Sequence, residues 1–170
     1  MSTIQGPAPG WAAQTGHARV RPLVADPGGD AGGRAAADRV LIAECINRYG
    51  WGYDERDEAL LAAGFTADAV WEGSVMGGDT VGPFEGRDAV VAFLEEFWEV
   101  QTDQRRHIFT NIVVDDLTAS TAVAHAYLLL TASTGGTMTP VTNGPYRLEM
   151  RKEDGIWRIA RLTAGFDAPF

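Results

Sequence analysis

Apolar positions recur with a helical period after residue 37 of the chain. From Leu41 to Tyr53 every fourth residue is apolar or aromatic, and two isoleucines stand beside this row. Such spacing places the side chains in one stripe and predicts a helix of about four turns. Asp38, which precedes the row, is expected to be the N-cap. The stripe consists of Leu41, Ile42, Cys45, Ile46, Tyr49 and Tyr53.

Two further helices are expected, with one strand between them. Asp57 can cap a short helix over residues 58–63, which Gly64 ends. Residues 69–75 have the pattern of a strand, and a glycine-rich loop follows them. Residues 88–100 then return to a helical period with a wide apolar face.

From Arg105 onward the apolar period changes from helical to extended. The run Glu153-Asp154-Gly155 is typical of a tight hairpin between two of the strands. Helices first and antiparallel strands afterwards predict an α+β domain, with three helices packed on a strongly curved antiparallel sheet. A twisted sheet that wraps a long helix forms a cone around a pocket. The four expected strands cover residues 107–114, 121–131, 141–152 and 156–162.

Residues 1–37 differ from the rest of the chain in composition. Gly, Ala and Pro fill 20 of these 37 positions, and no apolar period runs through them. Such a segment buries too little apolar surface to offset the entropy of ordering it. We therefore expect a flexible leader over residues 1–37 and one domain over residues 38–170.

Charge and composition narrow the function classes. The chain has 170 residues and a formal net charge of −9, so it would repel nucleic acid. No stretch of about 18 apolar residues is present to span a membrane. The single cysteine, Cys45, rules out an internal disulfide and a cysteine-rich zinc site, and fits a cytoplasmic protein. No His-x-x-x-His pair or phosphate-binding glycine loop occurs either, so neither metal nor cofactor is expected.

The best candidates for chemistry are one carboxylate and one imidazole. The predicted stripe ends in Tyr53 and Asp54, and His107 opens an otherwise apolar strand. A neutral imidazole is a competent base near pH 7, and a neighbouring carboxylate selects its tautomer. A tyrosine hydroxyl can polarise a carbonyl group. Asp54, His107 and Tyr53 are the candidate catalytic residues, although Asp54 also fits a structural helix end and His107 a surface position.

Candidate substrate-binding residues are the aromatic and polar side chains that would face the same interior. By two-residue alternation, Asn111 shares a face with His107. The sequence leaves open which face of the sheet the other strand residues occupy. An apolar wall around the site would strengthen its polar contacts by excluding water. The candidates are Tyr49, Trp71, Phe93, Asn111, Tyr127 and Tyr146.

Several short runs along the domain resemble those of one protein family. They are Asn47-Arg48-Tyr49, residues 53–57, residues 65–71, residues 106–115 and residues 154–159. Together they resemble the SnoaL-like family of the nuclear-transport-factor-like cone-fold superfamily. The resemblance covers about residues 36–165, which is the whole domain without the leader.

The resemblance implies a cofactor-independent cyclase, dehydratase or isomerase that acts on a small hydrophobic, polyketide-like secondary metabolite. Locally the chain is most similar to scytalone dehydratase, in which an aspartate and a histidine at the positions of Asp54 and His107 act together as base. The same comparison implies that tyrosines hold a water on the substrate carbonyl. The chain departs from that enzyme at Thr131-Ala132 and Pro145-Tyr146, where a second histidine and a serine would be expected.

Two alternatives remain open from the sequence. The same residues suit an enzyme that opens an epoxide with water or an internal hydroxyl. A protein of a different class, a ligand-binding module or a dioxygenase-type small subunit, would need no catalytic pair. In such a subunit the exposed face of the sheet would meet a large partner. A stand-alone protein would form a homodimer or homotrimer through this face, or remain monomeric.

Overall fold

The computed structural model of the chain describes residue 20 and residues 29–170. The expected flexible leader falls mainly on residues 1–19 and 21–28, which lie outside the described residues. Residues 29–37 are helical and form the first turns of helix α2, Gly29–Asp54. The prediction that this helix begins at Asp38 is therefore wrong. Alanine and arginine favour a helix even where no apolar stripe exists, and most side chains of this segment are exposed.

Asp38 is a buried contact residue inside α2 rather than its N-cap. Its Oδ1 accepts hydrogen bonds from Lys152 Nζ and Trp157 Nε1, each at 2.8 Å. Burial acts to raise the pKa of this carboxyl group, but the two hydrogen bonds and the charge of Lys152 outweigh it, so the pKa is lowered. The contact ties α2 to the last two strands of the sheet.

The two shorter helices agree with the sequence pattern. Helix α3 covers Glu58–Ala63, with the Leu60 N–H donating to the Asp57 carboxylate at the N-cap. Helix α4 covers Arg87–Val100. The predicted stripe of α2 is buried except for Leu41, which is 45% exposed. A row repeated every four residues drifts around a helix of 3.6 residues per turn, so its first member leaves the buried face.

Six strands form one curled sheet in the order β2-β1-β6-β5-β4-β3. The predicted antiparallel run of four strands is confirmed. One parallel pair, between β1 and β6, was not foreseen. The strands are β1 Phe65–Val75, β2 Thr80–Glu85, β3 Gln104–Asp115, β4 Thr121–Thr134, β5 Thr137–Glu153 and β6 Ile156–Phe166.

Strand β2 takes up the later part of the glycine-rich segment that the sequence pattern suggested as a loop, and residues 76–79 form the turn before it. It contains Gly82 and Pro83 and pairs only with β1 at the edge of the sheet. Proline cannot donate a hydrogen bond to a ladder, so it is tolerated on an edge strand, where one side of the backbone has no partner. Composition alone therefore favoured a loop where the sheet has its edge.

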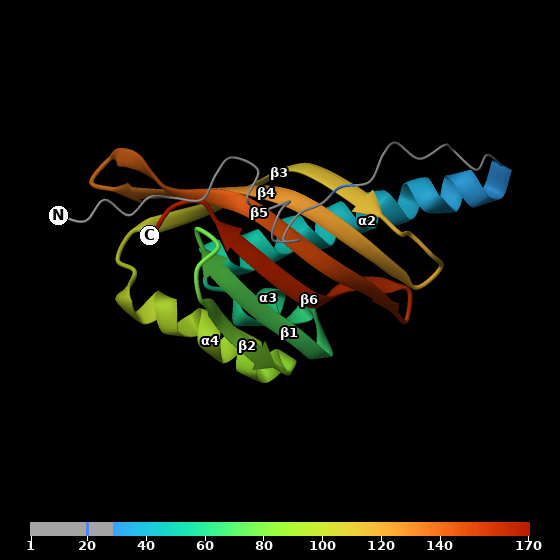
Figure 1. Cartoon of the computed structure of the whole chain (residues 1–170), viewed down its shortest axis with the longest axis horizontal. Coiled ribbons are helices and arrows are strands. Elements are labelled where there is room, and N and C mark those ends of the chain that lie inside the picture. Colours follow the sequence, from blue (N-terminus) through green and yellow to red (C-terminus); the bar gives the residue numbers. More distant parts are fainter. Residues whose placement is uncertain (1–19, 21–28) are drawn as a thin grey trace.

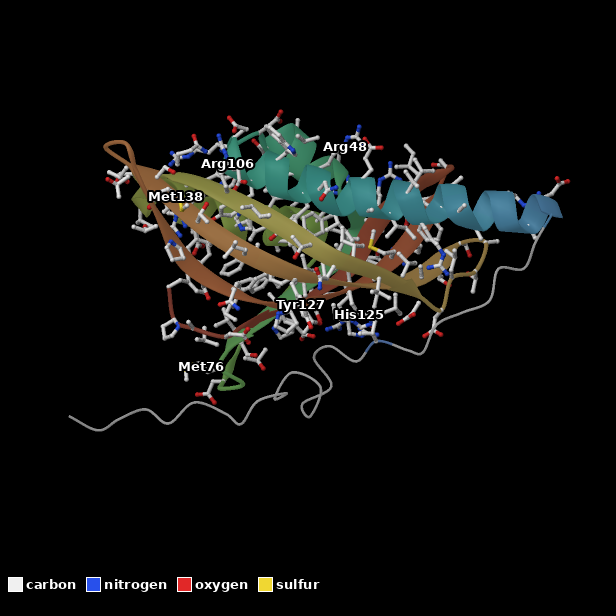
Figure 2. All side chains as sticks on the ribbon, turned by 90° about the horizontal axis from the view of Figure 1, so that it is seen from above. Arg48, Met76, Arg106, His125, Tyr127 and Met138 are labelled. Atoms are coloured by element: carbon white, nitrogen blue, oxygen red, sulfur yellow. The ribbon has the colours of Figure 1, made fainter. Side chains whose placement is uncertain are left out.

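The sheet curves around the long helix (Figure 1). Helix α2 packs against β3 and β6, and α4 packs against β1 and β2. Figure 2, seen from above, shows α2 along the concave side of the sheet, with Tyr127 and His125 on the opposite side. The core lies between the helices and the inner face of the sheet. The predicted α+β class is thus confirmed. No helix in residues 29–170 is long and apolar enough to cross a membrane.

Candidate active site

Asp54 and His107 are joined by two hydrogen bonds through a single carboxylate. Asp54 is the last residue of α2, and His107 lies near the start of β3. Asp54 Oδ1 is 2.6 Å from His107 Nδ1, and Oδ2 accepts the His107 backbone N–H at 2.7 Å. Both side chains are only 6% exposed. One carboxylate therefore fixes the backbone and the ring of the histidine at the same time.

This double contact selects the chemical form of the imidazole. A carboxylate can only accept, so Nδ1 of the ring carries the hydrogen that Asp54 binds. In the neutral ring Nε2 then has the lone pair, and it is the nitrogen left for proton transfer. If the ring takes up a proton at Nε2, the adjacent carboxylate stabilises the resulting positive charge.

A glycine lets the strand approach the helix at this point. A Cβ atom at Gly50 of α2 would lie 3.2 Å from Phe109 Cε2 and 3.3 Å from His107 Cβ. Any side chain at position 50 would therefore press on β3 beside the pair. The Gly50 contact was not anticipated from the sequence, because a glycine within a helical pattern carries no sign of what packs against it.

Aromatic rings surround the imidazole. The His107 ring centroid lies 4.7 Å from that of Tyr53, 6.2 Å from Phe109 and 6.3 Å from Tyr49. The Tyr53 hydroxyl donates to Gln101 Oε1 at 3.2 Å. Burial raises the pKa of Tyr53, so its hydroxyl stays protonated at neutral pH. The three candidate catalytic residues are thus brought together.

Four of the predicted substrate-binding residues lie deeper on the same side. Tyr49 and Tyr146 are 1% and 2% exposed, and burial raises the pKa of both hydroxyls. The ring of Tyr146 is 5.5 Å from that of Phe109, which links it to His107. Trp71 and Phe93 are also buried, with ring centroids 4.8 Å apart. The pocket inside the cone, which the sequence pattern predicts, stays a prediction.

Two predicted lining residues lie elsewhere. Tyr127 is 54% exposed, because β4 alternation directs its neighbours Ala126 and Leu128 into the core instead. Asn111 is exposed and has a φ of 53° at a bulge where the pairing of β3 with β4 shifts between Thr110 and Val113. The bulge breaks the two-residue alternation that would have placed Asn111 beside His107.

Sequence reasoning missed three residues around Tyr53, namely Trp98, Gln101 and Arg105. Gln101 follows the end of α4, where no periodic pattern marks it. Trp98 lies within the helix predicted over residues 88–100, for which the sequence pattern indicated an apolar face but no role in the site. Arg105 could have been found, because the alternation that pointed from His107 to Asn111 also points back to Arg105.

An open polar hollow of about 450 Å³ lies at the rim of the sheet, against Asp54. The end of α2, the connection from α4 to β3 and the β4–β5 hairpin contribute to it. In residues 29–170 no group of three or more His, Cys, Asp or Glu side chains is placed to hold a metal ion. The hollow is lined by Asp54, Glu55, Arg56, Thr102, Asp103, Gln104, Ser133, Thr134 and Gly135.

A sequence profile for the SnoaL-like domain matches residues 34–163 of the chain. The chain belongs to the SnoaL-like family. The SnoaL-like match includes Asp54 and His107, so the pair lies within the family domain. No curated protein matches this chain.

Solved structures share the cone-shaped fold of this SnoaL-like chain. A protein from Catenulispora acidiphila, solved in complex with S-DNPA, is 29% identical with a TM-score of 0.66, over 77% of this chain and 94% of that one. An NTF2-like protein with a cystatin-like fold from Novosphingobium aromaticivorans is 25% identical with a TM-score of 0.65, over 78% and 84% of the two chains. A protein of unknown function from Mycobacterium tuberculosis is 22% identical with a TM-score of 0.69, over 79% and 75%.

Proposed function

We propose that this protein is a cofactor-independent enzyme in which His107 is the general base and Asp54 is its partner. The observation that carries the proposal is the double contact of one carboxylate with the His107 N–H and Nδ1. A ring held in this way needs no reorganisation before it accepts a proton, and such preorganisation lowers a reaction barrier. Burial of both side chains keeps water from competing for the same groups.

The reaction class is proton transfer that leads to cyclisation, dehydration or isomerisation. His107 Nε2 removes a proton from a carbon atom next to a carbonyl group, and Asp54 stabilises the imidazolium that forms. The imidazolium then returns the proton to another carbon atom or to a leaving hydroxyl group. The Tyr53 ring lies beside the imidazole, and its protonated hydroxyl can donate to a substrate or water in exchange for Gln101 Oε1, its acceptor in this structure.

The proposed substrate is a small, hydrophobic, polyketide-like metabolite. Aromatic rings from α2, β1, α4, β3 and β5 surround the imidazole or lie deeper on the same side, and flat apolar molecules pack well on such surfaces. Membership of the SnoaL-like family supports the same class, because the family resemblance implies polyketide cyclases and related enzymes.

Hydrogen–deuterium exchange tests the base without knowledge of the product. The purified protein is incubated in D₂O with small aryl ketones such as 2-tetralone and 2-acetylnaphthalene, and deuterium at the carbon next to the carbonyl is measured by NMR. We expect the protein to accelerate exchange of at least one ketone. Because general base catalysis typically contributes about 10²–10⁴ in rate, His107→Ala should lower the exchange rate by that factor.

Two further variants make the test specific. Asp54→Asn keeps the shape of the Asp54 side chain but removes its charge. In the double variant, the loss of exchange rate that it causes should not add to the loss caused by His107→Ala. Arg106→Gln changes an exposed residue that pairs with Glu55 at 2.9 Å, and it should exchange at the wild-type rate. Wild-type exchange by a folded His107→Ala protein would refute the proposal.

A second candidate, a non-catalytic binding protein or subunit, is favoured by the outer face of the sheet. Ile108, Tyr127 and Leu129 are 42%, 54% and 41% exposed there. Ile108 and Leu129 are direct partners across β3 and β4, so the apolar patch is continuous. Exposed apolar patches often mark protein interfaces. The mass of the purified chain in solution separates a homodimer or homotrimer through this face from a monomer that needs a different partner.

A further inference from the structure

Arg105 faces the same side of β3 as His107. The two residues are separated by one position, which corresponds to about 7 Å along a strand. In the first half of β3, Arg105, His107 and Phe109 are less exposed than the residues between them. The Arg105 side chain is only 17% exposed, although it carries a permanent charge.

The guanidinium of Arg105 has one nitrogen without a hydrogen-bond partner. Its Nε and Nη2 donate to the two carboxylate oxygens of Asp103 at 2.5 and 3.1 Å. Its Nη1 is buried and makes no hydrogen bond within the described part of the chain. A buried charged donor without an acceptor is costly and uncommon, so its presence calls for an acceptor that a ligand supplies.

A second buried donor without an acceptor among the described residues belongs to Trp98, whose ring contacts Tyr53. The Trp98 Nε1 is buried and has no hydrogen-bond partner among residues 29–170. The ring of Trp98 is 6.0 Å from that of Tyr53, which in turn contacts His107. Burial raises the pKa of the Tyr53 hydroxyl, and the hydrogen bond to Gln101 and the charge of Arg105 act against that rise. Within the described part of the chain, therefore, two buried donors have no acceptor: one lies two residues before the proposed base on the same face of β3, and the other contacts Tyr53, which contacts that base.

We propose that Arg105 Nη1, with Trp98 Nε1, binds the substrate oxygen on which negative charge gathers when His107 removes a proton. This inference rests on the proposed function and deepens it by naming the substrate class. The substrate is a ketone that passes through an enolate. Asp103 is a positioning residue, because it holds the guanidinium in one orientation through two of its nitrogens.

The chemistry of the step agrees with an arginine at this position. The substrate C–H bond breaks and an N–H bond forms at His107 Nε2. The electron pair of the broken bond forms a carbon–carbon double bond, and the carbonyl π electrons move to the oxygen that Arg105 binds. Arginine does not release its proton at physiological pH, so it stabilises an enolate without protonating it. Opening an epoxide needs a proton donor for the oxygen, so this arrangement favours the carbonyl substrate.

The ionisation of 4-nitrophenol on the protein tests the proposal. Its ionised form is yellow and resembles an enolate oxygen on a flat ring, so absorbance reports which form is bound. The probe is titrated with protein at a pH where about half of it is ionised in solution. We expect the wild-type protein to increase the ionised fraction of the bound probe. The double variant Arg105→Gln/Asp103→Asn, which leaves no unpaired carboxylate, should decrease that fraction below its value in solution.

Two controls separate this inference from the proposed function. Arg106→Gln, on the outer face of the same strand, should keep the wild-type preference for the ionised probe. His107→Ala should lose ketone exchange but still bind the ionised probe, because Arg105 remains. Wild-type exchange by His107→Ala would refute the base and leave the oxygen site standing. Binding of the neutral form by wild-type protein, absence of binding at millimolar probe, or an unchanged preference in the folded double variant would overturn the assignment of Arg105.

Discussion

Gly50 on α2 and His107 on β3 are packed so closely that a Cβ atom at position 50 would lie 3.3 Å from the His107 Cβ atom. Contacts of this length force a neighbour to move by a few tenths of an ångström. The neighbour here is the strand that carries the proposed base. The closeness of helix and strand at this point is therefore coupled to the geometry of the Asp54–His107 pair.

Gly50→Ala should impair activity more than stability. Alanine favours a helix by up to about 1 kcal/mol over glycine, which offsets part of the cost of the contact. The shift of β3 should lower ketone exchange about tenfold, since displacement of a catalytic group by 1 Å can cost about 100-fold. Gly33→Ala is the matched control, because nothing lies within 4 Å of its Cβ and it should only stabilise the same helix. Unchanged exchange in a folded Gly50→Ala protein would contradict this prediction.

The neutral His107 ring should be present as a single tautomer, with hydrogen on Nδ1. The Asp54 carboxylate accepts from that nitrogen at 2.6 Å, which excludes the other neutral form. Histidine-selective ¹⁵N NMR reads the two nitrogens separately, and His107→Ala assigns the signals by their disappearance. In Asp54→Asn the amide has both a donor and an acceptor, so the preference should weaken. A dominant Nε2–H form in the wild-type protein would show that the contact is misassigned.

Asp38→Asn should destabilise the protein at pH 7 by about 1.5–3 kcal/mol, the range for hydrogen bonds to charged groups. The amide oxygen can still accept from Trp157 Nε1, but the charge that Lys152 binds is lost. The folded pKa of Asp38 lies below the ordinary value of 3.8. The contribution of the Asp38 carboxylate to the free energy of unfolding is therefore complete above pH 3.8 and is lost as the pH falls through the folded pKa.

Urea unfolding between pH 7 and pH 2, followed by tryptophan fluorescence, measures this difference. The gap in unfolding free energy between wild type and Asp38→Asn should be constant near neutral pH and should narrow below about pH 4. A gap that stays constant down to pH 2, or widens, would mean that the carboxylate is not stabilised by its partners.

Cys45 should react slowly with thiol reagents in the folded protein. Burial raises the pKa of its thiol to about 11, and only 8% of the residue is exposed. At pH 8 the reactive thiolate is then about 100-fold scarcer than for an unshifted thiol with a pKa of 9.0. The colour released by Ellman's reagent should appear slowly in buffer and at once in denaturant. Equal rates in both would show that the thiol is accessible in the folded state.

Local signals along the chain were sufficient for much of the fold. The capped helix α3 needs only Asp57 and Gly64, because both ends of a short helix are decided by side-chain and backbone contacts within a few residues. The long strands of the meander follow from alternation, and their antiparallel pairing follows from short connections. The early start of α2 was missed because helix propensity without an apolar stripe is a weak signal.

The site required contacts between residues far apart in the chain. Asp54 and His107 are 53 positions apart, and the family resemblance brought them together where spacing alone did not. The bulge at Asn111 and the outward direction of Tyr127 depend on how β3 pairs with β4. Alternation from His107 points to Arg105 rather than Arg106 as the inward arginine, but no pattern in the sequence marks that its Nη1 is buried without an acceptor among residues 29–170.

By itself, therefore, the sequence determined the α+β class, most helices and strands and the residue types available for acid–base chemistry, because these depend on period, capping and composition. Only the tertiary structure decided that one carboxylate binds both the backbone and the ring of His107, and that Gly50 lets β3 approach the helix. It alone also decided that Arg105 has a buried donor with no acceptor among residues 29–170. The physical reason is that burial and hydrogen-bond satisfaction are properties of packed neighbours, and a linear pattern does not contain those neighbours.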